Sequence, residues 1–220
     1  MVIQGRKPWT ESGLQAIRAT FPTVRPGPEF TAAPLWPSAG ICGWIVSVTD
    51  TKQMSDGGRR GQGRHGQGGA TFGLCHGVRR GKVQAWFRKK PGNANVIGTD
   101  ISQTATQFEN TVRWDFHDEN PDWEAKADFV YSNSWDHAYD PGKAFHAWAK
   151  CLKHSGWLLI DLTGGLMPES SNVLVPFGAT RDAVIRILGE SCGDLGRVTV
   201  VLDRTGDEEY PATVIVFQRG

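Results

Sequence analysis

Carboxylates, histidines and small polar residues recur at the ends of four short apolar runs in the first two thirds of the chain. The runs are TFGLC, NVIGT, TVRW and ADFVYS, and after them come His76–Gly77, Asp100, Asp115 and Asn133 in turn. Their β-branched and aromatic content predicts strands. The carboxyl ends of strands in an open parallel α/β sheet line one edge, where ligands bind. The sequence therefore predicts one site built from four strand ends.

The first two strand ends suit a nucleoside. Asp100 follows Gly77 by about twenty residues, the spacing of a carboxylate that accepts hydrogen bonds from ribose hydroxyls. Gly73, Cys75, His76 and Gly77 are expected at the first strand-to-helix turn, where glycine lets backbone amides approach a ligand. The structural alternatives are a helix N-cap at Asp100 and a plain tight turn at Gly77.

The third strand end places a carboxylate beside an aromatic ring. Asp115 would accept the exocyclic amine of an adenine, and Phe116 would pack on its face. His117, the next residue, is assigned to substrate binding. A solvated acidic loop is the alternative, since Asp118 and Glu119 follow.

The fourth strand end carries the candidate proton-transfer groups. Asp136 or His137 could act as the general base. Histidine is the residue type better matched to proton transfer at neutral pH, so His137 is favoured, with Asp136 as its partner. Asn133 and Ser134 are assigned to the cofactor and Trp135 to the substrate. The alternative is a polar turn in which the side chains of this segment satisfy backbone amides.

A metal site is a further alternative for the same edge. Its ligands would be Cys75, His76, His117 and His137. These residues lack the close paired spacing of protein zinc sites, so no metal is expected.

The scaffold for these residues is predicted from hydrophobic periodicity. A first helix carries Val83, Trp86 and Phe87 on one face, and a short one begins near Ser102. Asp140 and Pro141 have the residue types of an N-cap and first helical position.

The helix after Pro141 is expected to include Lys150, Lys153 and His154 in its last turn and to stop at Gly156. Strand WLLIDL and a helix from Thr180 to Gly189 follow. RVTVVLDR and ATVIVFQR then predict an antiparallel hairpin, which completes an α/β fold.

Length and composition limit the number of domains and the classes of partner that the chain can have. The 220 residues suit one α/β domain, and a net charge of +1 gives no general basic field for nucleic acid or membrane. No secretory signal or spanning segment is evident, and the four cysteines are unpaired in spacing, so a cytoplasmic protein is expected. We expect a Pro-rich arm with one short helix and a strand over 1–56, a mobile Gly/Arg-rich loop over 57–69, and the main domain over 70–220.

The 57–69 segment, GGRRGQGRHGQGG, has three interpretations. It is a flexible surface loop, or a lid in which Arg59, Arg60 or Arg64 meets an anionic group, with Arg64 assigned to substrate binding. An RNA-binding segment is less favoured because repeated aromatic stacking partners are missing.

Over roughly residues 70 to 218 the chain resembles the class I S-adenosylmethionine-dependent methyltransferases. The resemblance is strongest in VIGTDIS and in SNSWDHAYDPGKAFHAWAKCLKHSGWLLIDL. It implies a Rossmann-like, mostly parallel seven-stranded sheet with helices on both faces and an antiparallel last strand. The cofactor's methionine would lie near Gly73–Gly77, its ribose at Asp100 and its adenine between Ile101, Asp115 and Phe116.

The same resemblance places Asn133 near the sulfonium and turns Trp135–His137 toward the acceptor. One motif departs from the family: the acidic-x-Gly-x-Gly-x-Gly pattern meets Gly73, Cys75, Gly77 and Arg79, so its acid and two glycines are replaced.

The resemblance implies an S-adenosylmethionine-dependent methyltransferase. We expect a small-molecule or sugar-like acceptor, with nucleic acid less favoured, no membrane partner, and no expectation for the oligomeric state. One alternative is a nicotinamide-dependent oxidoreductase, which would ordinarily carry a fuller G-x-G-x-x-G turn. The other is a non-catalytic nucleotide- or cofactor-binding module that uses the Gly/Arg loop for a partner.

Overall fold

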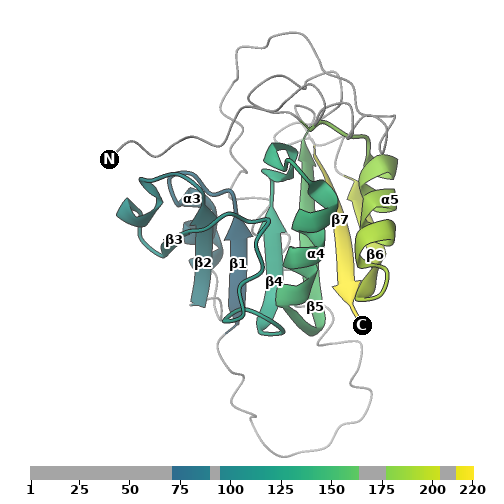
Figure 1. Ribbon diagram of the computed structural model, residues 1–220, viewed down its shortest axis with the longest axis horizontal. Helices are drawn as coiled ribbons and strands as arrows, with labels where there is room; N and C mark the ends of the chain where they lie inside the picture. The colour runs from purple at the N-terminus through teal and green to yellow at the C-terminus, as the bar shows by residue number, and fades with distance from the viewer. Residues whose placement is uncertain (1–70, 90–94, 164–176, 204–211) are drawn as a thin grey trace, which may run out of the picture.

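The structure is a computed structural model that describes residues 71–89, 95–163, 177–203 and 212–220 (Figure 1). The predictions for the 1–56 arm, the 57–69 loop and Arg64 lie outside the described residues. No helix in the described ranges is long and apolar enough to cross a membrane.

The described residues form one seven-stranded sheet in the order β3-β2-β1-β4-β5-β7-β6. Strands β1 to β5 run parallel, and β7 is antiparallel to both β5 and β6. The predicted mostly parallel sheet and its antiparallel hairpin are confirmed. The strands are β1 (Phe72–His76), β2 (Asn95–Asp100), β3 (Thr111–Arg113), β4 (Ala127–Ser132), β5 (Leu152–Thr163), β6 (Gly196–Asp203) and β7 (Ala212–Arg219).

Helices cover both faces of the sheet (Figure 1). Helix α3 (Lys82–Arg88) buries Phe87 in a cluster with Phe129 and Tyr131 of β4 on one face. Helices α4 (Pro141–Cys151) and α5 (Arg181–Cys192) pack on the other face. Two short 3-10 helices, η1 (Ala105–Gln107) and η2 (Trp135–His137), follow β2 and β4. The chain changes direction across the sheet between β1 and β4, and this is where an open α/β sheet binds ligands.

The start of α4 is as predicted. The Asp140 carboxylate accepts the backbone N–H of Lys143 at 2.9 Å, and Pro141 stands at the first helical position.

Two predicted helix ends are wrong. Helix α4 ends at Cys151, and Leu152 already pairs with Ala127, so Lys153 and His154 belong to β5. Helix α5 continues past Gly189 to Cys192 because that glycine occupies an ordinary helical position with open space around it. At Leu152 the pairing of β5 with β4 outweighed the local helical pattern, whereas at Gly189 the helix continued past the local stop signal and buried Cys192.

Candidate active site

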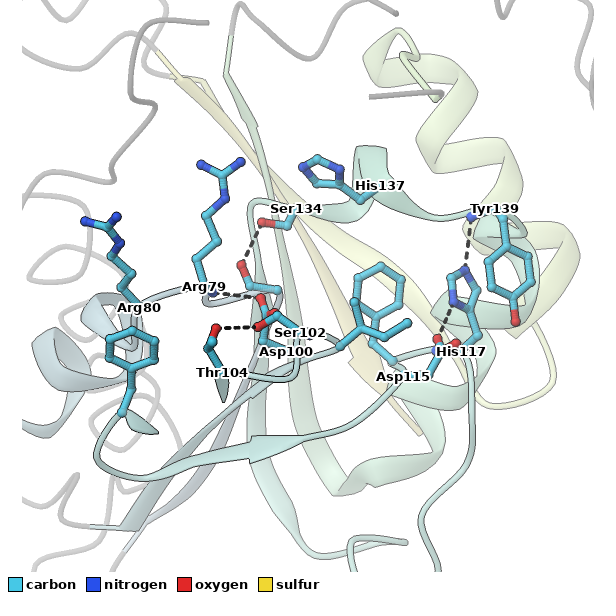
Figure 2. Close-up of a pocket in the computed structure, with 14 residues that line it drawn as sticks. Arg79, Arg80, Asp100, Ser102, Thr104, Asp115, His117, Ser134, His137 and Tyr139 are labelled. Atoms are coloured by element: carbon cyan, nitrogen blue, oxygen red, sulfur yellow. Dashed lines mark hydrogen bonds and ion pairs between the residues drawn. The ribbon is translucent and has the colours of Figure 1, made fainter. Parts of the chain in front are cut away.

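A pocket of about 690 Å³ opens at the carboxyl ends of β1, β2, β3 and β4 (Figure 2). This volume is within the usual range for small-molecule sites. Three of the four predicted strand ends contribute side chains, and the first contributes Gly77 with the two arginines that follow its turn. The lining residues are Gly77, Arg79, Arg80, Asp100, Ile101, Ser102, Thr104, Phe108, Asp115, Phe116, His117, Ser134, His137 and Tyr139.

Asp100 is held firmly at the end of β2. Its Oδ2 accepts the backbone N–H of Arg79 and its Oδ1 that of Ser102, both at 2.9 Å. No α-helix begins here, so the N-cap alternative for Asp100 is wrong. A carboxylate has about four acceptor positions, which leaves some of them for a ligand. The next side chain, Ile101, is 63% exposed and lines the same pocket, so it offers an apolar surface to a flat ring.

Asp115 and His117 form a clamp beyond β3. His117 Nε2 faces the backbone N–H of Tyr139 at 3.1 Å, and because that N–H can only donate, Nε2 accepts. The ring proton is therefore on Nδ1, which donates to Asp115 Oδ1 at 2.7 Å. Burial lowers the pKa of His117 below its usual value, although Asp115 opposes the shift. Both ring nitrogens of His117 thus have protein partners, whereas the neighbouring Phe116 ring lines the pocket.

Most of the residues predicted at the turn after the first strand belong to strand β1 itself, contrary to prediction. Cys75 is buried on the α3 face, and His76 is buried on the α4 face, where it stacks on Trp148. A Cβ at Gly73 would lie 2.2 Å from the Phe129 ring, so packing explains this glycine. Burial lowers the pKa of His76 to about 3 and keeps its ring neutral. Only Gly77 of the four predicted residues reaches the turn.

The backbone N–H groups of this turn already donate hydrogen bonds within the protein. The N–H groups of Gly77 and Val78 both donate to the carbonyl of Thr99, at 2.9 and 3.1 Å, and that of Arg79 donates to Asp100. The expectation that backbone amides here approach a ligand is therefore wrong for these three positions. The turn instead fixes β1 to the end of β2.

Some side chains that follow the fourth strand are buried in the core, and others line the pocket. Trp135 is buried and donates from Nε1 to the carbonyl of Asp161 at 2.9 Å, so its predicted turn toward the acceptor is wrong. Ser134 lines the pocket and donates to the carbonyl of Gly77 at 3.0 Å. Asn133 is half-buried and does not line this pocket.

Asp136 and His137 differ in exposure. Asp136 is buried, its Oδ1 has no hydrogen-bond partner within the described part of the chain, and burial raises its pKa to about 6. His137 is exposed and lines the pocket, and its charge opposes that shift. Only His137 is therefore accessible to an acceptor in the pocket.

Several pocket residues were not predicted from the sequence. Arg79 stands at the third glycine of the family pattern, and that pattern predicts no role for an arginine side chain there. The others carried no signal because they come from loops whose course is decided by packing; they are Arg80, Ser102, Thr104, Phe108 and Tyr139. Across the described ranges no group of three or more metal-ligating residues occurs.

The pocket residues fit an adenosyl group. Asp100 offers a fixed carboxylate, and Ile101 and Phe116 offer apolar surface in the same pocket. The methionine end differs, since the acid of the family pattern is replaced by Gly73 beneath Phe129. The pocket residues therefore fit the adenosyl part of such a cofactor, whereas the residues expected around its methionine part differ from the family pattern.

The fold is shared with solved methyltransferases of low sequence identity. A putative sarcosine dimethylglycine methyltransferase from Galdieria sulphuraria aligns with a TM-score of 0.56 at 14% identity, over 94% of this chain and 98% of that one. A 1,6-didemethyltoxoflavin-N1-methyltransferase from Burkholderia thailandensis aligns with a TM-score of 0.52 at 14% identity, over 89% and 94%. A putative methyltransferase of Haloferax volcanii, solved with the Trm112 activator, aligns with a TM-score of 0.53 at 13% identity, over 84% and 99%.

No curated protein matches the sequence. The family model described as a methyltransferase domain matches residues 74–160, which run from within β1 into β5 and include every residue that lines the pocket. The cofactor of this family, S-adenosylmethionine, agrees with the adenosyl fit of the pocket. The domain match over residues 74–160, together with the shared fold, supports the class I S-adenosylmethionine-dependent methyltransferase family for this chain.

Proposed function

We propose that the chain transfers the methyl group of S-adenosylmethionine to a small-molecule acceptor, with residues 70–220 as the catalytic domain of a cytoplasmic protein. The observation that carries this proposal is one pocket of about 690 Å³ that has Asp100, Ile101 and Phe116 around its nucleoside end and His137 at its rim. The size and the mixture of apolar walls with few polar groups suit a small ligand.

In this proposal Asp100 binds the ribose hydroxyls, while Asp115 and Phe116 bind the adenine against Ile101. The bound cofactor supplies an electrophilic methyl group on a sulfonium. The pocket residues hold the acceptor in line with that methyl group and exclude water. His137 accepts the acceptor's proton where the acceptor must lose one. Asp136 acts on His137 through its charge rather than by contact with the acceptor.

The acceptor class rests on pocket size and on the titles of two proteins of the same fold. One is solved with 1,6-didemethyltoxoflavin and S-adenosylhomocysteine, and another is described as a putative sarcosine dimethylglycine methyltransferase. Both names denote small acceptors. A third is solved with an activator protein, so a protein partner is a second possibility for the surface of this chain.

Calorimetric titration of the full chain with S-adenosylhomocysteine and with NADH tests the proposal. We expect binding of the first and none of the second. Asp100→Ala should weaken binding of S-adenosylhomocysteine by about 10- to 100-fold, because hydrogen bonds to a charged group are lost. Asp194→Ala, at an exposed turn after α5, is the control and should leave binding unchanged. NADH binding in place of S-adenosylhomocysteine would refute the proposal in favour of an oxidoreductase.

A further inference from the structure

Arg79 has an unusual backbone for its residue type. Its φ is +51°, in the left-handed region that glycine adopts far more easily than residues with a Cβ. It also stands where the family pattern has its third glycine. An arginine therefore occupies a left-handed backbone position that favours glycine. A residue held in a disfavoured conformation at a ligand site indicates a function for its side chain.

The arginine side chain lies at the methionine end of the pocket. Arg79 and Arg80 line the pocket together with Ser134 and His137, which come from the end of β4. Figure 2 shows Arg79 extending from the turn toward the end of the pocket where Ser134 and His137 lie. The two lining carboxylates, Asp100 and Asp115, come instead from the ends of β2 and β3.

Other groups at this turn cannot hold an anion. The N–H groups of Gly77, Val78 and Arg79 already donate to Thr99 and Asp100. Helix α3 begins only at Lys82 and is seven residues long. Within this turn, as the structure describes it, the side chains of Arg79 and Arg80 are the cationic groups that could hold an anion.

The usual partner for the cofactor's amine is also missing. The acidic position of the pattern is Gly73, and the Phe129 ring occupies the space where its side chain would begin. A ligand with both an amine and a carboxylate thus meets no acid at that position and meets cationic side chains at the rim. This arrangement favours recognition through the carboxylate.

We propose that Arg79 binds the α-carboxylate of the methionine part of the cofactor and so replaces the family's acid–amine contact. The inference rests on the proposed cofactor site. A guanidinium matches a carboxylate with two parallel hydrogen bonds, which makes the contact both strong and directional. Arg79 is then the residue that distinguishes a complete cofactor from one without its carboxylate.

The test compares two ligands that differ only in that group: S-adenosylhomocysteine and its decarboxylated analogue. Calorimetry on the full wild-type chain should show a preference of about 10- to 100-fold for S-adenosylhomocysteine, the range for a hydrogen bond to a charged group. Arg79→Gly should remove the preference by weakening S-adenosylhomocysteine alone. This variant suits the left-handed backbone and keeps the N–H that binds Asp100, so its fold should be retained.

Arg80→Ala is the matched control and should keep the preference, and Arg79→Lys should keep part of it. Thermal melting of each variant checks its fold. An Arg79→Gly protein that keeps the preference, or that loses affinity for both ligands equally, would overturn the inference. Loss of the preference in Arg80→Ala alone would assign the contact to Arg80 and overturn it as well. A wild-type chain that binds neither ligand would refute the proposed function together with this inference, whereas binding without preference refutes the inference alone.

Discussion

His117 and Asp115 are joined by a hydrogen bond of 2.7 Å between Nδ1 and Oδ1, while the opposite nitrogen of the same ring accepts the backbone N–H of Tyr139. The His117 ring also stacks on the Tyr139 ring, with centroids 3.6 Å apart. Tyr139 precedes Asp140, which caps α4. The clamp therefore connects the loop after β3, which lines the pocket, to the segment after β4.

Replacing His117 by Ala should lower the free energy of unfolding by about 2–4 kcal/mol, because buried polar groups lose their partners. Urea denaturation measures this. His154→Ala, at an exposed position of β5, is the control and should change stability by less than about 0.5 kcal/mol. Equal changes in the free energy of unfolding for the two substitutions would contradict a stabilising role for the contacts of His117.

His76 should make the protein sensitive to acid. Burial lowers the pKa of His76 to about 3 in the folded state, from 6.5 for an ordinary histidine. The unfolded chain therefore binds more protons below pH 6.5. Stability therefore falls as the pH falls from 6.5 toward 3, by about 1.4 kcal/mol for each pH unit. His76→Phe, which keeps an aromatic ring on Trp148, should flatten the slope of unfolding free energy against pH between 6.5 and 5. An unchanged slope would show that His76 does not titrate on unfolding.

Asp136 should change the stability of the protein with pH in the opposite direction to His76. Its pKa rises from 3.8 to about 6 on burial, so the native state holds a proton that the unfolded state has released, and stability falls as the pH rises from 3.8 to about 6. Asp136→Asn should stabilise the protein by about 1–3 kcal/mol at pH 8. The gain should shrink as the pH falls toward 4. Asp194→Asn, at an exposed position, should show no such gain, and a destabilised Asp136→Asn at pH 8 would refute the prediction.

His137→Ala should reduce methyl transfer at least 100-fold for an acceptor that loses a proton, the lower range for general-base catalysis. The affinity for S-adenosylhomocysteine should stay within about twofold, because the proposed role concerns the acceptor alone. Turnover can be followed as formation of S-adenosylhomocysteine with an acceptor found in a small-molecule panel. Unchanged turnover would remove His137 from the mechanism.

Gly73→Ala should destabilise the protein by about 1–3 kcal/mol, since the new methyl group meets the Phe129 ring. Gly189→Ala, inside α5 with open space around it, should instead stabilise by up to about 1 kcal/mol. Opposite signs in thermal unfolding would confirm that Gly73 is a packing residue. A neutral Gly73→Ala would return it to the candidates for ligand contact.

Local sequence patterns were sufficient for the positions of the strands along the chain and for the antiparallel C-terminal hairpin. The apolar runs, the Asp140–Pro141 helix start and the C-terminal hairpin all depend on short-range preferences, and the structure has each of them. The same patterns brought Asp100, Asp115 and His137 to one edge, because parallel strand ends meet there. Helix ends were predicted less well, since at Leu152 the pairing of β5 with β4 outweighed the local helical pattern.

The depth of each side chain was decided only by the tertiary structure. Sequence spacing could not tell that His76 and Trp135 face the core while His137 faces the pocket, because burial depends on which helix covers each face. It also could not tell that the turn after β1 uses its amides on Thr99 and Asp100, which brings together β1 and β2. The sequence by itself determined that these polar residues gather at one edge of an α/β sheet. Packing across the sheet determined which of them line the pocket.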